Sequence, residues 1–345
     1  MPGARLPDSR RETRGPKDRD ASSVGSLVHD DPAVLELRER MRGSLRGVLH
    51  ERGFLEVDTP VLSTEVLPEP HIDPITVEVP GTRGGPHYLQ ASPEALMKRL
   101  LAAGSGAIYQ FARSFRAKER GRWHDVEFVM LEWYEPGATL DDTATLVSRL
   151  CGATLGTDGL DRITCTRAFM EFSGVDPLAA TLDDLAAAGR RAGLAPPPGC
   201  DRDEPARRWD AWFELLLAEV VSPRLGHDRP AMLESWPVSQ AAFARVDPHE
   251  PRAARRFELI VSGVELANGW EEETSREVLE TRITDANRIR TGDGRPSLPP
   301  PARLLAAHGP GMPEGVGAAL GFDRLVMLAA AAPSIDAVRC FTSED

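Results

Sequence analysis

The sequence predicts an α+β fold. Short strand-like segments recur along the chain with helix-like segments between them, and their order does not follow the regular strand–helix repeat of a parallel α/β protein. With 345 residues, 41% hydrophobic and 27% charged, the chain can bury a substantial core. The longest apolar run near the C-terminus, residues 325–332, is far below the roughly 20 residues of a membrane-spanning helix.

The first thirty residues are rich in Arg, Asp, Ser, Pro and Gly and contain few large apolar side chains. They cannot bury enough surface to offset chain entropy, so we predict a disordered tail over residues 1–30. The same stretch lacks the apolar segment of a signal peptide, which favours a cytoplasmic protein. Residues 31–345 are predicted to form the ordered domain.

Helical order is predicted to begin at Asp30-Asp31-Pro32, where an N-cap precedes a proline in the first turn. Apolar residues at helical spacing continue this helix to about Arg52, and Gly53 ends it. A second helix, 93–103, begins with proline after Ser92. Strands are predicted at 54–57, 75–79, 87–91, 107–113 and 126–134.

The middle of the chain, residues 140–225, is rich in Ala and Leu and is predicted to be helical, with a loop at 195–205. The four cysteines lie far apart, which disfavours a zinc ribbon or a disulfide framework. The remaining predicted elements are strands at 256–261 and 263–271, a helix at about 275–291 and a strand–helix pair at 317–332.

The formal net charge of −12 bears on possible partners. Proteins that bind through many phosphate contacts usually carry a basic surface, so this balance disfavours a broad nucleic-acid interface. A moderately acidic balance is also common among enzymes that act on small molecules. The charge therefore narrows the functional classes only slightly.

Three segments stand out, and the second and third carry residue types that suit an anion held against a sheet. The first, RGFLEVDTPVL (52–62), is a helix end, a strand and a proline, and by itself has only a structural meaning. The second, FRAKERGRWHDVEFVMLEWYEP (115–136), places an Arg and a charged loop between two apolar strands. Arg binds phosphate oxygens in a planar, bidentate manner, although a solvated hairpin tip is the alternative interpretation. The third, GAALGFDRLVML (317–328), joins a Gly-rich strand to an Asp-Arg helix start.

In this order the three segments resemble motifs 1, 2 and 3 of class II aminoacyl-tRNA synthetases. The segments LQASPEALMKRLL (89–101) and GVELANGWEEE (263–273) are similar to the lysyl branch of that family. Each motif alone is weak evidence, but five in register over residues 34–332 are very specific. The resemblance implies a class II catalytic core, an antiparallel β-sheet of six or seven strands flanked by helices. It also implies ATP as a substrate and a homodimer formed through motif 1.

Two features resemble the short paralogues of this branch, which ligate (R)-β-lysine onto a lysine of translation elongation factor P. Lysyl-tRNA synthetases carry an anticodon-binding OB domain before motif 1, whereas here only a tail and one helix precede Gly53. Motif 3 has Ala319 where the tRNA enzymes have glycine, and the extra methyl group is expected to reshape the pocket against an α-amino group. The resemblance implies elongation factor P as acceptor and β-lysine as amino acid, with no role for tRNA or a membrane.

The implied reaction is attack of the amino-acid carboxylate on the α-phosphate of ATP, which requires positioning and charge neutralisation. By resemblance Arg116 holds the α-phosphate and Arg324 the γ-phosphate. Phe128 is expected to stack on adenine, although packing in the sheet core is the alternative. The other residues implied in ATP binding are Lys118, His124, Asp125, Glu265, Leu266 and Gly321.

The remaining motif residues are mostly glutamates, which can bind a metal ion or the two ammonium groups of a lysine-like amino acid. Glu265 and Glu272 offer the hard oxygen ligands that suit Mg²⁺, and the resemblance places Glu265 on the metal and nucleotide and Glu272 between metal and substrate. Without that resemblance, two solvated strand residues are the simpler interpretation. Burying two ammonium groups is costly unless each is paired. The resemblance therefore assigns one amino group to Glu94 with Ser92, and the terminal ammonium to Glu132 with Tyr134.

Two departures from the family pattern accompany these matches. Ala117-Lys118 stand where Asn-Glu is expected, and Asp125 stands where Asn is expected. An alternative function is a stand-alone lysine-type adenylating enzyme that acts on a small molecule, a carrier protein or tRNA. A non-catalytic paralogue is disfavoured because both motif arginines and both glutamates are present.

Overall fold

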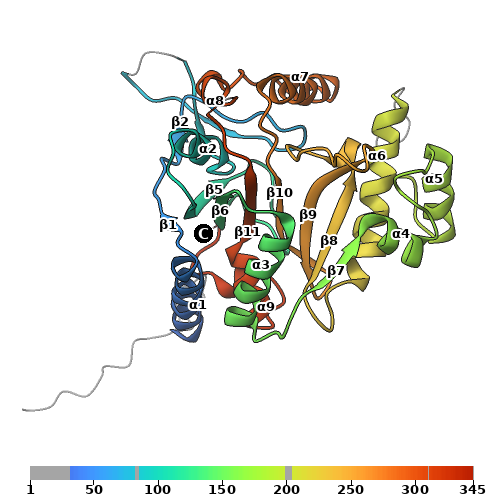
Figure 1. Cartoon of the computed structure of the whole chain (residues 1–345), viewed down its shortest axis with the longest axis horizontal. Helices are drawn as coiled ribbons and strands as arrows, with labels where there is room; N and C mark the ends of the chain where they lie inside the picture. Colours follow the sequence, from blue (N-terminus) through green and yellow to red (C-terminus); the bar gives the residue numbers. More distant parts are fainter. Residues whose placement is uncertain (1–31, 82–84, 199–203, 310, 345) are drawn as a thin grey trace, which may run out of the picture.

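An eight-stranded sheet forms the centre of the computed structural model, which describes residues 32–81, 85–198, 204–309 and 311–344. The strand order is β1-β5-β6-β11-β10-β9-β8-β7, and neighbours are antiparallel except for the edge pairs β1–β5 and β7–β8 (Figure 1). The tail predicted over residues 1–30 lies outside the described residues. The strands are β1 (Leu55–Glu56), β5 (Ile108–Phe115), β6 (Glu127–Pro136), β7 (Asp161–Thr164), β8 (Ala231–Pro237), β9 (Ala253–Val261), β10 (Val264–Glu271) and β11 (Gly315–Gly321).

The predicted antiparallel sheet flanked by helices is confirmed, with one or two strands more than expected. The strand predicted at 54–57 is the two-residue edge strand β1. The segments predicted at 75–79 and 87–91 form strands that do not join the main sheet. They belong to a three-stranded sheet of order β2-β4-β3, made of β2 (Leu62–Ser63), β3 (Ile75–Val77) and β4 (His87–Leu89).

Three helices cover the apolar face of the main sheet. The predicted first helix is α1 (Pro32–Glu51), and its apolar residues at helical spacing, such as Met41 and Leu45, are buried. Gly53 follows it with φ of +87°, a conformation that glycine adopts without strain. Alternate residues of β6, Leu131 and Trp133, join the same core. The other two helices of this layer are α3 (Leu140–Leu155) and α9 (Phe322–Ala329).

The opposite face of the sheet carries a second layer of helices, seen above the sheet in Figure 1. In α2 (Glu94–Ala102), Met97 and Leu101 pack against Ile108 and Tyr134 of the sheet. The helix predicted at 275–291 is α7 (Arg276–Gly292), and its apolar side packs with α8 (Ala302–Ala307), an element that was not predicted.

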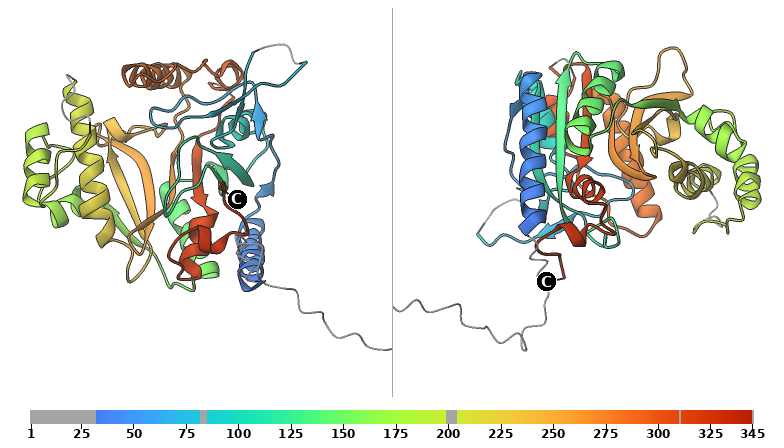
Figure 2. Two further views of the ribbon diagram at one scale, coloured as in Figure 1. Left: turned by 180° about the vertical axis from the view of Figure 1, so that it is seen from behind. Right: turned by 90° about the horizontal axis from the view of Figure 1, so that it is seen from below.

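A separate core lies beside β7 and β8, at the edge of the sheet farthest from α1 (Figure 2). It is built on stacked aromatic rings, with the Phe169 and Phe213 centroids 4.8 Å apart and those of Trp209 and Phe213 5.4 Å apart. The helices predicted in 140–225 are confirmed, but the strands β7 and β8 were not predicted. Part of the predicted 195–205 loop, residues 199–203, lies outside the described residues. The helices of this core are α4 (Cys165–Ser173), α5 (Leu182–Arg191) and α6 (Pro205–Leu216).

A membrane-crossing segment was not expected from the sequence. Among the described residues, no helix combines the length and the apolar character that crossing a bilayer requires.

Candidate active site

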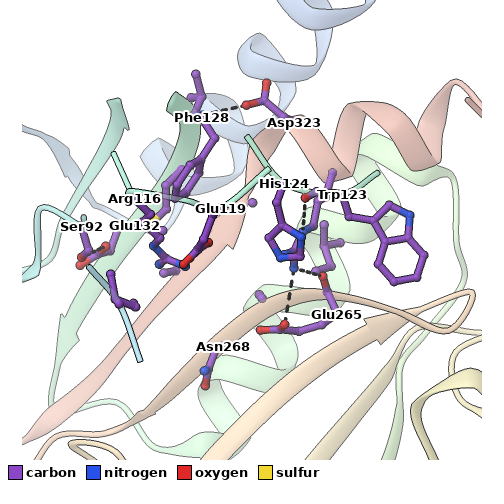
Figure 3. Close-up of a pocket in the computed structure, with 18 of the residues that line it drawn as sticks. Ser92, Arg116, Glu119, Trp123, His124, Phe128, Glu132, Glu265, Asn268 and Asp323 are labelled. Atoms are coloured by element: carbon purple, nitrogen blue, oxygen red, sulfur yellow. Dashed lines mark hydrogen bonds and ion pairs between the residues drawn. The ribbon is translucent and has the colours of Figure 1, made fainter. Parts of the chain in front are cut away.

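A cavity of about 490 Å³ opens on the sheet face opposite α1, and Figure 3 shows part of its lining. Side chains of a strand point alternately to its two faces. In β6 one alternate set, Val129, Leu131 and Trp133, enters the core, while the other set lines the cavity. That second set is Phe128, Met130, Glu132 and Tyr134, three of which were predicted to contact substrate or ATP.

The strand register sets the cavity floor. Ala319 of β11 lies between Glu132 of β6 and Asn268 of β10, its partners in the two ladders. Gly317 lies in the same way next to Tyr134. A methyl group on Gly317 would overlap a Glu272 oxygen and the Tyr134 ring, so the close packing of these side chains requires glycine at this position.

One end of the cavity is a buried carboxylate site. Glu132 is 2% exposed and accepts a hydrogen bond from the Ser92 hydroxyl at 2.7 Å and one from the Tyr134 hydroxyl at 2.6 Å. Burial, together with the nearby Glu94, raises the pKa of Glu132 to about 8. The structure thus brings Glu132 and Tyr134 together as predicted, whereas Ser92, predicted beside Glu94, bonds to Glu132 and also accepts a hydrogen bond from the Glu94 N–H at 3.0 Å. A cation placed here would be strongly favoured.

Lys98 is the principal residue at this end that the sequence analysis did not identify. Its ammonium group is 2.7 Å from Glu94 Oε1 and 2.6 Å from Glu272 Oε2, and all three side chains are buried. Burial alone would lower the pKa of Lys98, but the two carboxylates outweigh burial and raise the pKa. Glu94 and Lys98 are four residues apart on α2, so helical ion-pair spacing was the signal in the sequence.

The other end of the cavity carries the two motif arginines. The Arg116 guanidinium lies 5.0 Å from the centre of the Phe128 ring, and its Nη1 is 3.7 Å from a Glu119 oxygen. Figure 3 shows Arg116 and Phe128 between the buried carboxylate end and the group formed by Trp123, His124 and Glu265. An aromatic face and a guanidinium here can receive a purine ring and a phosphate.

Arg324 is held by three neighbours. It donates from Nε to the Trp123 carbonyl at 3.2 Å and from Nη1 to the Glu265 carbonyl at 2.8 Å. Its Nη2 lies 2.6 Å from His124 Nε2. Burial and the Arg324 charge lower the pKa of His124, so His124 is neutral at pH 7 and accepts this bond. The predicted residues His124, Glu265 and Arg324 are therefore adjacent.

Asp125 is fully buried, and its carboxylate points to the C-terminal segment. Arg339 and the Ser343 hydroxyl both bond to it, and the Ser343 N–H donates to Oδ2 at 3.0 Å. Although burial alone would raise it, the pKa of Asp125 is lowered by these donors and by the Arg339 charge. Asp125, predicted as an ATP contact, borders the cavity, and its carboxylate anchors the motif 2 loop. The residues involved lie more than 200 positions apart, and no sequence signal indicated the pairing.

Lys118, the departure from the family pattern, lies at the edge of the cavity. Its side chain is 81% exposed, and its ammonium is 3.3 Å from an Asp73 oxygen. Its φ of +68° places it in the left-handed region. The Ala117 N–H donates to the Asp73 carbonyl at 2.8 Å, so the loop between β2 and β3 supports motif 2 here.

The two glutamates predicted as metal ligands have different surroundings. The Glu265 side chain is 44% exposed and lines the cavity, where it can hold a cation beside a bound nucleotide. Glu272 is the buried partner of Lys98, so metal binding by Glu272 would require Lys98 to move away. Among the described residues there is no group of three or more His, Cys, Asp or Glu side chains that could hold a metal ion.

The remaining predicted ATP contacts, Leu266 and Gly321, both border the cavity. The Leu266 side chain is 1% exposed and belongs to the main core, so only its main chain can face a nucleotide. Gly321 ends β11 directly before α9, the helix that carries Arg324. Asn268, which was not predicted, also borders the cavity, and its Oδ1 accepts a 3.2 Å bond from Arg256 Nε.

Comparison with known proteins agrees with this geometry. The family described as tRNA synthetases class II (D, K and N) matches residues 29–345. The elongation factor P–(R)-β-lysine ligase of Sodalis glossinidius (strain morsitans) is 40% identical over 315 residues, covering 90% of this chain and 95% of that protein. The ligase of the same name from Vibrio vulnificus (strain YJ016) is 38% identical over 321 residues, covering 90% and 96%.

Proposed function

Because the chain belongs to the class II tRNA synthetase family, in its D, K and N group, we propose that it is an ATP-dependent ligase that joins (R)-β-lysine to elongation factor P. The observation that carries the proposal is one cavity with buried carboxylates at one end and two arginines at the other. A diamine acid and a nucleotide fit these two ends. The acceptor is a lysine of elongation factor P, by similarity to the ligases that bear that name.

The chemistry has two steps. A carboxylate oxygen of the amino acid attacks the α-phosphorus of ATP, and the bond to pyrophosphate breaks to leave an aminoacyl adenylate. A neutral amine of the acceptor lysine then attacks the acyl carbon, the bond to AMP breaks, and the amine loses its proton. Arg116 neutralises charge at the α-phosphate and Arg324 at the γ-phosphate, so positioning and charge compensation supply the catalysis.

The purine stacks on Phe128 in this proposal, and the main chain at Lys118, Leu266 and Gly321 borders the nucleotide. Arg324 exchanges its bonds to His124 and Glu265 for phosphate oxygens. Asp125 contributes by anchoring the loop that carries Arg116 and His124. Phe128 and Arg116 already lie 5.0 Å apart, which supports a shared role at the adenine and the α-phosphate.

The amino acid lies over Ala319 with its terminal ammonium against Glu132 and Tyr134, and Ser92 orients Glu132. Glu94 borders the cavity and is joined to the buried Glu272 through Lys98. Because Glu132 is buried, an incoming ammonium restores the interaction that the carboxylate lost on leaving water.

Glu265 is the residue that would hold Mg²⁺ together with phosphate oxygens, since its carboxylate is partly exposed and borders the cavity. When bound, the metal supplies additional neutralisation of the phosphate charge. Glu272 remains a candidate ligand only if Lys98 leaves its side.

We further propose that residues 31–345 form a single catalytic domain, that the enzyme works in the cytoplasm and that it forms a homodimer through α1 and β1. Leu35 and Leu55, on those two elements, are 51% and 60% exposed, which supports an interface there. The net charge of −12 supports a protein acceptor over tRNA.

The test combines two measurements on the full chain. ATP–pyrophosphate exchange with α-lysine and both enantiomers of β-lysine is expected to favour (R)-β-lysine. Incubation with ATP, (R)-β-lysine and elongation factor P is expected to add one β-lysyl group, detected by mass spectrometry. Exchange without labelling of elongation factor P would contradict this acceptor and favour a small molecule or carrier protein.

A further inference from the structure

The acidic end of the cavity contains a carboxylate, Glu69, whose side chain has neither a hydrogen-bond donor nor a paired cation among the described residues. Glu94 and Glu272 share Lys98, and Glu132 accepts two hydroxyl hydrogen bonds. Glu69 also lines the cavity, yet among the described residues no cation lies within ion-pair distance of its carboxylate. Burial raises the pKa of Glu69 to about 7, so a cation placed beside it would relieve an unfavourable charge.

The charged groups around Glu69 locate it along the cavity. Glu69 lines a small hollow together with Ala91 and Glu94. Arg116 donates from Nε to the Ala91 carbonyl at 3.4 Å, so its guanidinium borders the same hollow. Arg116 marks the α-phosphate and therefore the reacting carboxylate of the amino acid. Glu69 thus lies beside the carboxylate end of the substrate, whereas Glu132 lies at the buried end with Tyr134.

The segment that carries Glu69 has no regular secondary structure, but it is held firmly. Arg290 of α7 is 1% exposed and donates from Nη1 to the Glu69 carbonyl at 3.2 Å and to the Ile72 carbonyl at 2.6 Å. Its Nη2 donates to Asp73 at 3.0 Å, and Arg295 bonds to the Pro70 carbonyl. A buried guanidinium used in this way fixes the backbone of residues 69–73 and so positions the Glu69 side chain.

We propose that Glu69 is a specificity-determining residue that binds the substrate amino group nearer to the reacting carboxylate. The proposal rests on the proposed function and refines it. The substrate brings two ammonium groups: one is received by Glu132 and Tyr134, and the other by Glu69 beside Glu94. Arg290 is the positioning residue of this contact.

The test uses three substrates of the full-length enzyme in pyrophosphate exchange. They are (R)-β-lysine, 6-aminohexanoate, which lacks the amino group near the carboxylate, and 3-aminohexanoate, which lacks the terminal one. The Glu69→Gln variant is expected to have a KM for (R)-β-lysine and for 3-aminohexanoate that is roughly 10- to 100-fold higher, because it loses a charged hydrogen bond to the substrate. KM for 6-aminohexanoate and KM for ATP are expected to stay unchanged.

Glu78→Gln is the matched control, because Glu78 is an exposed carboxylate that follows β3 and does not border the cavity. Glu69→Asp keeps the charge and is expected to retain part of the discrimination between (R)-β-lysine and 6-aminohexanoate. This variant shows whether the loss in Glu69→Gln comes from the missing charge or from misfolding. An unchanged ratio of KM values for (R)-β-lysine and 6-aminohexanoate would overturn the proposal. The proposal would also be overturned if Glu69→Gln raised KM for 6-aminohexanoate, which keeps only the terminal amino group, and left KM for 3-aminohexanoate unchanged. A wild-type enzyme that forms no β-lysyl adenylate would instead overturn the proposed function, and this proposal with it.

Discussion

The two ends of the cavity are built in different ways. At the amino-acid end, Glu94, Lys98 and Glu132 belong to a helix and a strand and are at most 7% exposed. At the nucleotide end, Lys118 and Glu265 have side chains that are 81% and 44% exposed. The loop at that end, residues 116–125, is held by ion pairs to the C-terminal segment. Glu94, Lys98 and Glu132 are therefore fixed by a helix and a strand, whereas the motif 2 loop at the other end is fixed by ion pairs to a distant segment.

In the proposed function, this difference matches the needs of the two ligands. A diamine acid brings ammonium groups that need partners already in place, since burying an unpaired ammonium is costly. ATP brings negatively charged phosphates. Their oxygens can replace the hydrogen-bond partners that the arginines have before ATP binds. Arg324 has its Nη2 on His124 and its Nη1 on Glu265, both replaceable by phosphate oxygens. The comparison therefore predicts that substitutions at the amino-acid end affect stability and specificity, and those in the tethers affect mainly ATP use.

The strongest test of the comparison is Lys98→Met. The variant leaves two buried carboxylates without their shared cation, and removing one partner of a buried ion pair typically costs about 3–5 kcal/mol. We expect the free energy of unfolding, measured by urea denaturation, to fall by about that amount.

Arg99→Met is the matched control for Lys98→Met, because Arg99 is the next residue of α2 and is only partly buried. Its effect is expected within about 0.5 kcal/mol. Adding Glu272→Gln to Lys98→Met should recover part of the loss by removing one uncompensated charge. Equal stability of Lys98→Met and Arg99→Met would contradict the inference that the charged groups at the amino-acid end are paired before substrate binds.

A smaller effect is expected from Ala319→Gly, which sharpens the comparison because it changes specificity without changing charge. The methyl group of Ala319 stands between Glu132 and Asn268, and removing it enlarges the floor of the cavity. The preference for β-lysine over α-lysine, measured as the ratio of kcat/KM values in pyrophosphate exchange, is expected to fall by about tenfold or more.

Ala318→Gly provides the control for Ala319→Gly, since Ala318 faces the main core. It is expected to reduce stability and leave the amino-acid preference unchanged. If Ala319→Gly has the same preference as the wild type, the assigned role of this methyl group is wrong.

The smallest effect is expected from Asp125→Asn in the tether. The pKa of Asp125 is lowered in the folded protein, so its ionised form stabilises the fold above the unfolded pKa of about 3.8. This stabilisation is lost as pH falls through the folded pKa. The variant is expected to lose about 1 kcal/mol at pH 7 and to raise KM for ATP by less than tenfold.

Urea denaturation at several pH values checks the direction in which the stability difference between Asp125→Asn and the wild type changes with pH. The difference from the wild type should be constant from pH 7 to about pH 4 and should shrink below that range. Ser343→Ala is expected to act in the same direction with a smaller effect. A rise in KM for β-lysine equal to that for ATP would show that the two ends are not independent.

Local patterns in the sequence determined much of this protein. Helical spacing in α1 predicted its buried side, because this pattern depends only on neighbours within a few residues. The motif residues predicted that Glu132 and Tyr134 lie together, and the structure brings them within hydrogen-bond distance. The strand β8 was not predicted, because its place in the sheet depends on partners distant in the sequence.

The tertiary structure alone decided how the charges are paired. Lys98 lies 174 residues before Glu272 and Asp125 lies 214 residues before Arg339, so no local pattern could indicate either contact. Glu69 lines the cavity because Arg290, 221 residues away, binds its carbonyl. Sequence periodicity determines which face a side chain takes, whereas the energy of a buried charge depends on whichever residues the chain topology places beside it.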